Sequence, residues 1–576
     1  MNIAGKSDAF SLGLIGVGIQ TLNPILWAVN PIAAAVAVAL GTGGLLFPRA
    51  KLHYEKWVWK NTEGILIESD PVPNESFMES GYRLGLTRDN AYPVDLCDDL
   101  AVRHTAIVGQ SGVGKTTLAM YLLAQQIARN GGFLFIDAKI DLDTLNQLQH
   151  LAKLNGREDE LYVLNVSDPL FSNTYSPLIH GDADEKSARV MNLQEENANA
   201  DHYRQSAAHA FRVIFDALDR LNYTYTFADV TTLCQSSKAL TELQRELSVE
   251  HPSSSELMAF TTFLEQYSNA NQKTGEVTVN IELLKKNIGG MVSRMSQFAG
   301  GKFGEVFNSY NPEIDLFDII MNNKMLYVMI PTMAKDIQAL NLAKMILSDL
   351  RSVVAKIQGL PEYMRPNPNF IALCDEMGSY AIDSVRTLFE QGRSAHIQMM
   401  PAFQSFSQLN RVSPDFSDII IQNTWNKVFF KFGSKDAPED AATILGSCTE
   451  FIRSITASTS ESTSAQSLRT SPAGSDSGGV GISTGWREQE AFIVKPDMLR
   501  GLGKGQSMVQ IGADVFCIDT PMIGFPSKLP DFQVTKFRVK TPPNQRNYEM
   551  SKRYKEYSSM GGEKKNKSNN ASQGEY

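Results

Sequence analysis

Residues 109–117 are Gly109-Gln110-Ser111-Gly112-Val113-Gly114-Lys115-Thr116-Thr117, and they match the phosphate-binding pattern G-x-x-x-x-G-K-[ST]. A short apolar run, Thr105–Val108, precedes this loop, and a helical pattern, Thr117–Ala128, follows it. The glycines of such a loop let backbone N–H groups turn toward phosphates, while Lys115 neutralises phosphate charge and the Thr116 hydroxyl binds Mg²⁺. A chance match in a glycine-rich turn would lack the strand before and the helix after. The loop therefore predicts a P-loop NTPase that binds ATP and Mg²⁺.

A second motif lies far along the chain. The apolar run Phe370–Cys374 predicts a buried strand, and it ends in Asp375 and Glu376. In a Walker B strand the aspartate holds the metal through water, and the glutamate activates the attacking water. A strand that simply turns into solvent could also end in acids, but the loop at Lys115 favours the catalytic interpretation. The two motifs are 260 residues apart, so we expect an insertion within the nucleotide-binding core.

Length and composition indicate a multidomain, intracellular ATPase. A chain of 576 residues exceeds the size at which a single hydrophobic core stops growing. The five cysteines show neither metal-ligand spacing nor a paired pattern, which is typical of a reducing cytoplasm. A net charge of −9 argues against a globally basic nucleic-acid-binding protein. It leaves a local basic channel open, because net charge averages over the whole surface.

The N-terminal region predicts a membrane anchor. Residues 11–47 contain no charged side chain, which is long enough for one or two transmembrane helices with a turn at Asn23-Pro24 or Asn30-Pro31. A signal peptide is the alternative, but this apolar stretch is longer than a signal sequence requires. Basic residues interleaved with aromatic ones follow at 49–60. By the positive-inside rule, we expect everything after Phe47 in the cytoplasm. We therefore assign residues 1–60 to an N-terminal anchor in membrane lipid.

Periodicity predicts an α/β core that is interrupted by a helical domain. Apolar runs indicate further strands at Phe133–Asp137, Leu161–Asn165, Met325–Ile330, Ile397–Met400 and Lys427–Phe432. Helical spacing appears at Ala207–Leu221, Leu240–Leu247, Ser255–Tyr267, Ile281–Phe298 and Ile337–Ile357. Strands that alternate with helices predict a parallel sheet covered on both faces. We therefore assign residues 61–184 and 301–539 to the nucleotide-binding domain, and 185–300 to an inserted all-α domain.

Two segments are expected to lack a packed structure. Arg453–Gly485 is dense in Ser, Thr and Gly, which predicts a surface loop, with control by phosphorylation as the less favoured alternative. Lys540–Tyr576 is polar and rich in lysine, which predicts a disordered tail. A role of this tail in binding a partner stays open.

Several motifs together resemble one family, the type IV coupling proteins, which are TraD-like conjugation ATPases. They are Arg103-His104, the loop ending in Gly114-Lys115-Thr116-Thr117, Phe135–Lys139, Asp375-Glu376, Glu390-Gln391-Gly392-Arg393, Phe403–Leu409 and Val494–Gly505. The resemblance covers most of the chain, including the anchored N-terminus and the helical insertion. The phosphate-binding loop is shared by many NTPases. The Gly-Arg and Phe-Gln-Ser elements, at this spacing after Asp375-Glu376, restrict the NTPase families that fit the sequence.

The resemblance implies a hexameric motor with a RecA/FtsK-like P-loop core at the bacterial inner membrane. Such a motor links a relaxosome, with its relaxase, to a type IV secretion channel and moves single-stranded DNA. The resemblance also implies that Gln404 senses the γ-phosphate, that Arg393 enters the neighbouring subunit's site as a finger, and that Arg103 is a second basic position tied to the nucleotide. The plain alternatives are a loop amide for Gln404 and a surface ion pair for Arg393. The short connection between the two expected spans departs from the family pattern.

Two other classes of protein share parts of this pattern. An FtsK-like double-stranded DNA translocase has the same core, but we would expect more membrane spans and a C-terminal winged-helix domain. A nucleotide-dependent scaffold that recruits protein effectors to a secretion channel is the other alternative. The presence of both Asp375 and Glu376 argues against an inactive site, but it does not identify the cargo.

Overall fold

The structure, a computed structural model, describes residues 66–67, 80–193, 201–270, 277–332, 336–460, 479–537, 546–550 and 552–553. Across these ranges, no helix is both long enough and apolar enough to cross a membrane. The anchor predicted within residues 11–47 lies outside the described residues, so it stays a prediction.

An eleven-stranded sheet organises the core, in the order β3-β2-β17-β16-β13-β4-β12-β11-β5-β10-β6. Seven consecutive strands, from β13 to β6, run parallel to one another. They are β13 (Asn426–Phe429), β4 (Thr105–Val108), β12 (Ile397–Phe403), β11 (Phe370–Cys374), β5 (Phe133–Asp137), β10 (Met325–Met329) and β6 (Leu161–Asn165). All of their residues are buried, as expected for parallel strands that are covered on both faces.

The predicted parallel sheet is confirmed for these seven strands, and it continues at one end as antiparallel strands. Four further strands pair antiparallel there: β2 (Gly81–Thr87), β3 (Pro93–Cys97), β16 (Gln506–Ile511) and β17 (Asp514–Asp519). Two of these pairs, β2 with β3 and β16 with β17, are joined by short connections, and strands joined in this way can only pair antiparallel. The turn between β16 and β17 contains Gly512 at φ +61°, a conformation that glycine adopts without steric cost.

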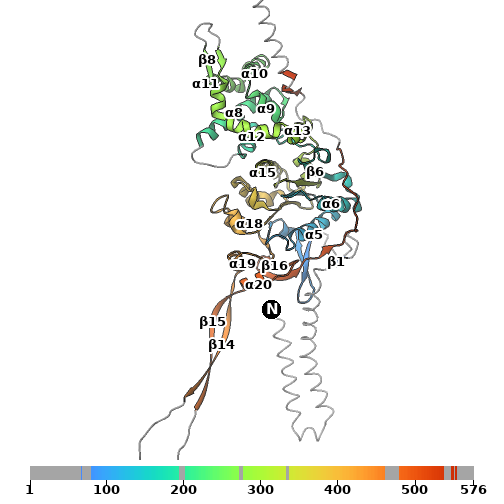
Figure 1. Ribbon diagram of the computed structural model, residues 1–576, viewed down its shortest axis with the longest axis vertical. Coiled ribbons are helices and arrows are strands. Elements are labelled where there is room, and N and C mark those ends of the chain that lie inside the picture. Colours follow the sequence, from blue (N-terminus) through green and yellow to red (C-terminus); the bar gives the residue numbers. More distant parts are fainter. Residues whose placement is uncertain are drawn as a thin grey trace, which may run out of the picture.

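Helices cover both faces of the sheet, which confirms an α/β fold (Figure 1). Phe133 and Phe135 of β5 join one hydrophobic cluster with α5 (Lys115–Ala128) and α6 (Leu142–Leu154). Alternate residues of the same strand face the other cluster, which includes α15 (Asp336–Gln358). The remaining helices of the core are α4 (Asp98–Ala101), α14 (Leu316–Met321), α16 (Arg386–Gln391), α17 (Phe406–Leu409), α18 (Phe416–Asn423), α19 (Ala437–Leu445) and α20 (Pro496–Arg500).

A mostly helical region connects β6 to β10, two strands that are neighbours in the sheet. Its helices are α7 (Ala183–Met191), α8 (Asp201–Arg220), α9 (Phe227–Leu233), α10 (Ser237–Glu250), α11 (Ser255–Gln266), α12 (Ile281–Ala299) and α13 (Gly301–Phe307). Its short strands are β7 (Tyr223–Thr224), β8 (Ser268–Ala270) and β9 (Val277–Val279). In Figure 1 these helices form a layer at one end of the molecule, beyond the sheet. We call this region the helical insert; its division from the core at residues 185 and 300 stays a prediction.

The surface loop predicted at Arg453–Gly485 is wrong in part. Strands β14 (Ser447–Ser460) and β15 (Gly479–Phe492) pair antiparallel along their whole length, and they project from the core as a ribbon (Figure 1). Ile455 pairs with Thr484, for example, and β-branched residues of this kind favour extended backbone. Cross-strand hydrogen bonds thus give this segment a structure that its polar composition does not predict.

The tail beyond residue 540 is also not disordered throughout. Residues Arg546–Asn547 form β19, which pairs parallel with β7 of the helical insert. Tyr548 and Met550 are each only 1% exposed. The composition of the tail does not predict this contact, because the groups that bind it belong to a distant part of the chain.

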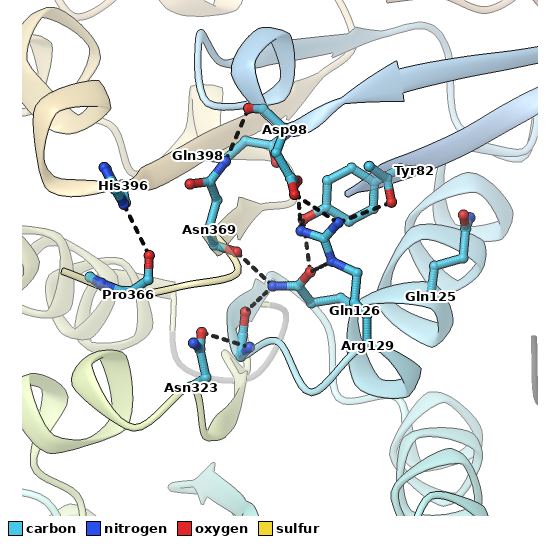
Figure 2. A network of polar contacts seen from close by, with 12 residues as sticks. Tyr82, Asp98, Gln125, Gln126, Arg129, Asn323, Pro366, Asn369, His396 and Gln398 are labelled. Carbon is cyan, nitrogen blue, oxygen red and sulfur yellow. Dashed lines mark hydrogen bonds and ion pairs between the residues drawn. The ribbon is translucent and has the colours of Figure 1, made fainter. Parts of the chain in front are cut away.

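A polar network fixes the C-terminal end of α5 at the amino edge of the sheet (Figure 2). The Gln126 side chain is fully buried; its Oε1 accepts from the Tyr82 hydroxyl at 2.7 Å, and its Nε2 donates to the Asn369 carbonyl at 2.7 Å and to the Gly132 carbonyl at 2.9 Å. Arg129 pairs with Asp98 at 2.6 Å and lies over the Tyr82 ring. The helix that begins in the phosphate-binding loop is therefore also held at its other end.

Replacing Gln126 with leucine is expected to destabilise the core. The Asn369 carbonyl would lose its Gln126 donor and the Tyr82 hydroxyl its acceptor, and each such loss costs about 1–3 kcal/mol. The Gly132 carbonyl would keep its bond from the Ile371 amide. We expect the free energy of opening of α5 to fall by about 3 kcal/mol, measured by amide hydrogen exchange. Gln147→Leu, at a half-buried position of α6, is the control and should change this value by less than about 1 kcal/mol. Unchanged exchange of α5 in Gln126→Leu would contradict the proposed stabilising role of the network.

Candidate nucleotide-binding site

The loop between β4 and α5 has the geometry of a phosphate cradle. Helix α5 begins at Lys115, and its N-cap residue Gly114 has φ +118°. A Cβ atom on Gly114 would lie 3.1 Å from the Cα atom of Gly505, so both the backbone conformation and the space favour glycine. The amide groups at the start of α5 have no partner one turn back within the helix, and they attract anions.

One pocket lies over this loop and brings the two sequence motifs together. Its lining residues are Ser111, Gly112, Gly114, Lys115, Thr116, Thr117, Lys139, Asp375, Glu376 and Lys504. The other predicted loop residues support it from outside: Val113 is buried, and the carbonyls of Gly109 and Gln110 accept hydrogen bonds from Lys115 Nζ at 2.6 Å and 3.1 Å. These two bonds hold the Lys115 ammonium group within the loop.

Charges in the pocket are partly removed from water. Burial lowers the pKa of Lys115, and the nearby Asp375 and Glu376 oppose this shift. Burial also raises the pKa of Asp375, while Lys115 acts in the opposite direction. Opposite charges therefore stabilise one another at a site of low polarity, where electrostatic interactions are stronger than in water.

Asp375 and Glu376, at the end of β11, differ in backbone conformation and in their contacts. The Asp375 amide donates to the Ile136 carbonyl at 2.9 Å, which continues the sheet pairing. Glu376 has φ +50°, a conformation that non-glycine residues seldom adopt and that is frequent at functional sites. Its carboxylate lies 3.6 Å from the ammonium group of Lys139. This turn directs both acids toward the phosphate-binding loop.

The oxygen atoms in the pocket suit a Mg²⁺ ion that is also bound by the phosphates of a nucleotide. The Thr116 hydroxyl and the Asp375 carboxylate both line the pocket, and oxygen ligands of this kind suit Mg²⁺. Within the described ranges, no group of three or more His, Cys, Asp or Glu side chains could hold a metal ion. A site with one or two protein oxygens is the arrangement expected when phosphates and waters complete the coordination.

Two lysines in the pocket were not predicted as site residues. Lys139 follows the carboxyl end of β5. Its position directly after a buried strand that ends in Asp137 could have predicted its place in the site. Burial raises the pKa of that aspartate to about 7, opposed by a hydrogen bond from the Tyr327 hydroxyl. Lys504 comes from the loop before β16, more than 380 residues after the phosphate-binding loop, and no local pattern connects the two.

The loop that carries Lys504 is fixed against the phosphate-binding loop. The Gly505 amide donates to the Val113 carbonyl at 2.8 Å, and the Gly505 carbonyl accepts from the Thr520 amide at 2.9 Å. Gln506 Oε1 accepts from the Gly503 amide at 2.8 Å. The antiparallel end of the sheet thus contributes a cation to the pocket.

Gln404 lies at the same edge of the sheet but does not line this pocket. It directly follows β12, which lies between β4 and β11. The backbone amide of Gln404 donates to Gln408 Oε1 at 3.1 Å, and Gln404 is half-buried. Its position between the two motif strands agrees with the predicted sensor position, while its role stays a prediction.

Arg393 and Arg103 lie at the opposite edge of the sheet. Arg393 belongs to the turn just before β12, and Arg103 lies just before β4, so both precede the amino ends of parallel strands. Arg393 is exposed, and the described part of the chain provides no ion pair for it. Arg103 lies over the Trp425 ring at 5.0 Å. The structure therefore does not bring either arginine to the phosphate pocket of its own chain.

His104 connects the Arg393 segment to the sheet. Its Nδ1 accepts from the Met399 amide at 3.1 Å, and its Nε2 contacts the Phe389 carbonyl at 3.0 Å and therefore carries the proton. The ring is 1% exposed, and burial lowers the pKa of His104 to about 4. A neutral histidine thus positions the helix that leads to Arg393.

Comparisons with known proteins agree with this geometry. Residues 369–502 match the family model described as "TraM recognition site of TraD and TraG", and residues 82–292 match "Helicase HerA, central domain". The type 4 coupling protein DotL of Legionella pneumophila subsp. pneumophila is 22% identical over an alignment of 378 residues, and the match covers 58% of this chain and 48% of DotL. The chain thus spans about half the length of this curated relative.

Solved structures of the coupling protein TrwB share the fold. The unbound form of TrwBdeltaN70 superimposes with a TM-score of 0.50 at 14% identity, over 77% of this chain and 90% of that one. TrwB in complex with ADP and Mg²⁺ gives a TM-score of 0.51 at 14% identity, over 76% and 90%. At this identity the likeness concerns the fold alone. The matches to the TraD and TraG family model and to DotL confirm the resemblance to the type IV coupling proteins.

Proposed function

We propose that this protein is a hexameric ATPase, anchored in the bacterial inner membrane, that couples a relaxosome to a type IV secretion channel and drives the transfer of single-stranded DNA. One observation carries the proposal: the phosphate-binding loop and the Asp375-Glu376 pair line a single pocket in a chain that resembles the type IV coupling proteins. The relatives support it, because TrwB is a bacterial conjugative coupling protein and its structure has been solved with ADP and Mg²⁺.

The residues of the pocket divide the chemistry of ATP hydrolysis among them. Lys115 binds the β- and γ-phosphates, and Thr116 and Asp375 would hold Mg²⁺, which neutralises phosphate charge when bound. Glu376 orients the attacking water and accepts its proton. Lys139, whose ammonium group lies 3.6 Å from the Glu376 carboxylate, orients this carboxylate near the phosphates.

Residues from two subunits complete the site. Arg393 is exposed at the edge of the sheet that faces away from its own pocket, which suits a finger that enters the pocket of a neighbouring subunit. Gln404 reports the γ-phosphate along β12, since this strand begins just after the Arg393 segment. Binding to the backbone of single-stranded DNA by basic and aromatic side chains would make transport independent of sequence.

Lys115→Ala and Glu376→Gln should separate binding from hydrolysis. Loss of the Lys115 ammonium group should abolish ATP binding. Glu376→Gln should retain ATP and lower turnover on the order of 10²–10⁴-fold, because only the general base is lost. Fluorescent-nucleotide titration and phosphate release measure the two effects. Turnover at the unchanged rate in Glu376→Gln would refute the role of this residue.

Lys504→Ala should weaken ATP binding about 10- to 100-fold, since a hydrogen bond to a charged group contributes about 1.5–3 kcal/mol. Lys504→Arg should retain most of the affinity. Lys495→Ala, an exposed lysine that does not line the pocket, is the matched control. Equal affinities of the Lys504→Ala and Lys495→Ala proteins would mean that Lys504 does not contact the nucleotide.

Mixing Arg393→Ala with Lys115→Ala protein tests the shared site. Each variant alone should be inactive; for Arg393 the loss is on the order of 10³–10⁵-fold, the contribution of an arginine finger. Mixed rings regain junctions in which Arg393 of one subunit faces Lys115 of the next, so DNA-stimulated ATPase activity should partly return. If mixed rings form, as measured by pull-down of a tagged subunit, and no activity returns, Arg393 does not act between subunits.

A further inference from the structure

The C-terminal segment 546–553 lies on the helical insert, far from the strands that precede it in sequence. In Figure 1 it is the short red strand beside the green helices α9 and α10, while β16, also red, lies in the core at the other end. Arg546 and Asn547 pair with Tyr223 and Thr224 of β7, and the Tyr548 amide donates to the Thr224 carbonyl at 2.9 Å. The segment thus adds a strand to an edge of the insert.

Two side chains of the segment are buried in the surface of the insert. Tyr548 and Met550 are each 1% exposed, and the Tyr548 ring meets Tyr223 edge-on at 5.2 Å. The Met550 amide donates to Asp229 Oδ1 at 2.8 Å. The insert holds this carboxylate in place, because Asp229 also closes the capping box of α9 and accepts from the Tyr310 hydroxyl at 2.9 Å.

Complementary charges fix both ends of the segment. Arg546 forms a forked pair with Glu250 at 2.9–3.0 Å. Arg553 donates to Glu246 at 2.5 Å and to the Tyr223 hydroxyl at 2.7 Å. The Arg553 pair is largely shielded from solvent, with side chains 20% and 16% exposed. Both glutamates lie on α10, so one helix recognises the two arginines.

The segment before it is bound to the nucleotide-binding core. Phe537 stacks on Tyr162 at 3.6 Å, and its amide donates to Glu313 Oε1 at 2.9 Å. Asn173 Nδ2 donates to the Thr535 carbonyl at 2.9 Å. The C-terminal part of the chain therefore contacts the core through residues 532–537 and the helical insert through residues 546–553.

We propose that β7, α9 and α10 form a peptide-docking site, and that the aromatic and basic segment 546–553 of the same chain is its detachable ligand. Strand addition supplies main-chain hydrogen bonds, Tyr548 and Met550 are buried against the insert, and the α10 glutamates select the arginines. The acceptors for Arg546, for the Tyr548 and Met550 amides, and the Glu246 acceptor for Arg553 belong to the folded insert, whereas the surrounding tail has a composition that does not form a core. The site therefore exists without its ligand, and the proposal does not depend on the nucleotide chemistry.

Charge reversal in the full-length protein tests the docking contact. Arg553→Glu and Glu246→Arg should each raise the hydrogen-exchange rate of the Tyr548 and Met550 amides at least about 10-fold, because a shielded charge pair is broken. The double variant should restore most of the protection. Glu265→Arg, which changes an exposed charge of α11 away from the α10 contact, is the matched control and should leave these rates unchanged.

Exchange of α12 amides reports whether each variant keeps the insert folded. A wild-type protein in which Tyr548 and Met550 exchange without protection would overturn the proposal. So would a double variant that, with α12 intact, exchanges as fast as the single variants.

A labelled peptide of residues 544–555 tests whether the ligand detaches. Full-length protein with Arg546→Glu, Tyr548→Ala and Arg553→Glu should leave its own site open, and it should bind the peptide at least about 10-fold more tightly than wild type, as measured by fluorescence anisotropy. These substitutions lie in the tail, so the insert stays folded. Equal binding to both proteins, or no binding to either, would overturn the assignment of 546–553 as a detachable ligand.

Discussion

The parallel pairing of β4, β12 and β11 is the constraint on which the nucleotide site depends. Parallel neighbours end at the same edge of a sheet, so the phosphate-binding loop after β4 and the acids after β11 meet there although 260 residues separate them. The pairing also leaves one strand between the two motifs, and Gln404 follows that strand. The phosphates of a nucleotide can therefore lie between the cationic phosphate-binding loop and the two carboxylates.

The same parallel order separates the arginines from the site they are expected to serve. Arg103 and Arg393 precede the strands whose other ends carry the pocket, so a single chain presents the pocket at one edge and the arginines at the other. His104 stabilises this second edge in its neutral form, since the Met399 amide needs an acceptor at Nδ1. A ring of subunits would bring the two edges together, which is the physical basis for proposing a shared site.

The antiparallel end of the sheet has a function beyond extending the core. Its loop at Gly503–Gly505 packs so closely on the phosphate-binding loop that a Cβ atom on Gly114 would lie 3.1 Å from the Cα atom of Gly505. Lys504 reaches the pocket because of that contact. The chain then continues across the core to the helical insert, where Glu246 and Glu250 bind its two arginines. The C-terminal third therefore contacts both the nucleotide site and the insert.

Short stretches of sequence predicted much of the fold and of the nucleotide-binding site. Neighbouring residues in the sequence predict the phosphate-binding loop, the acids after Phe370–Cys374, and most strands and helices of the core. The reason is that a helix or strand places its apolar residues at a regular spacing, which can be recognised in the sequence. The antiparallel strands, the β14–β15 ribbon, the approach of Lys504 and the docking of Tyr548 do not follow in this way. Each depends on which distant backbone or side chain supplies the partner. That choice is made by packing in three dimensions, where the free energy of a hydrogen bond or a buried ring depends on the surface it meets and not on its neighbours in the chain.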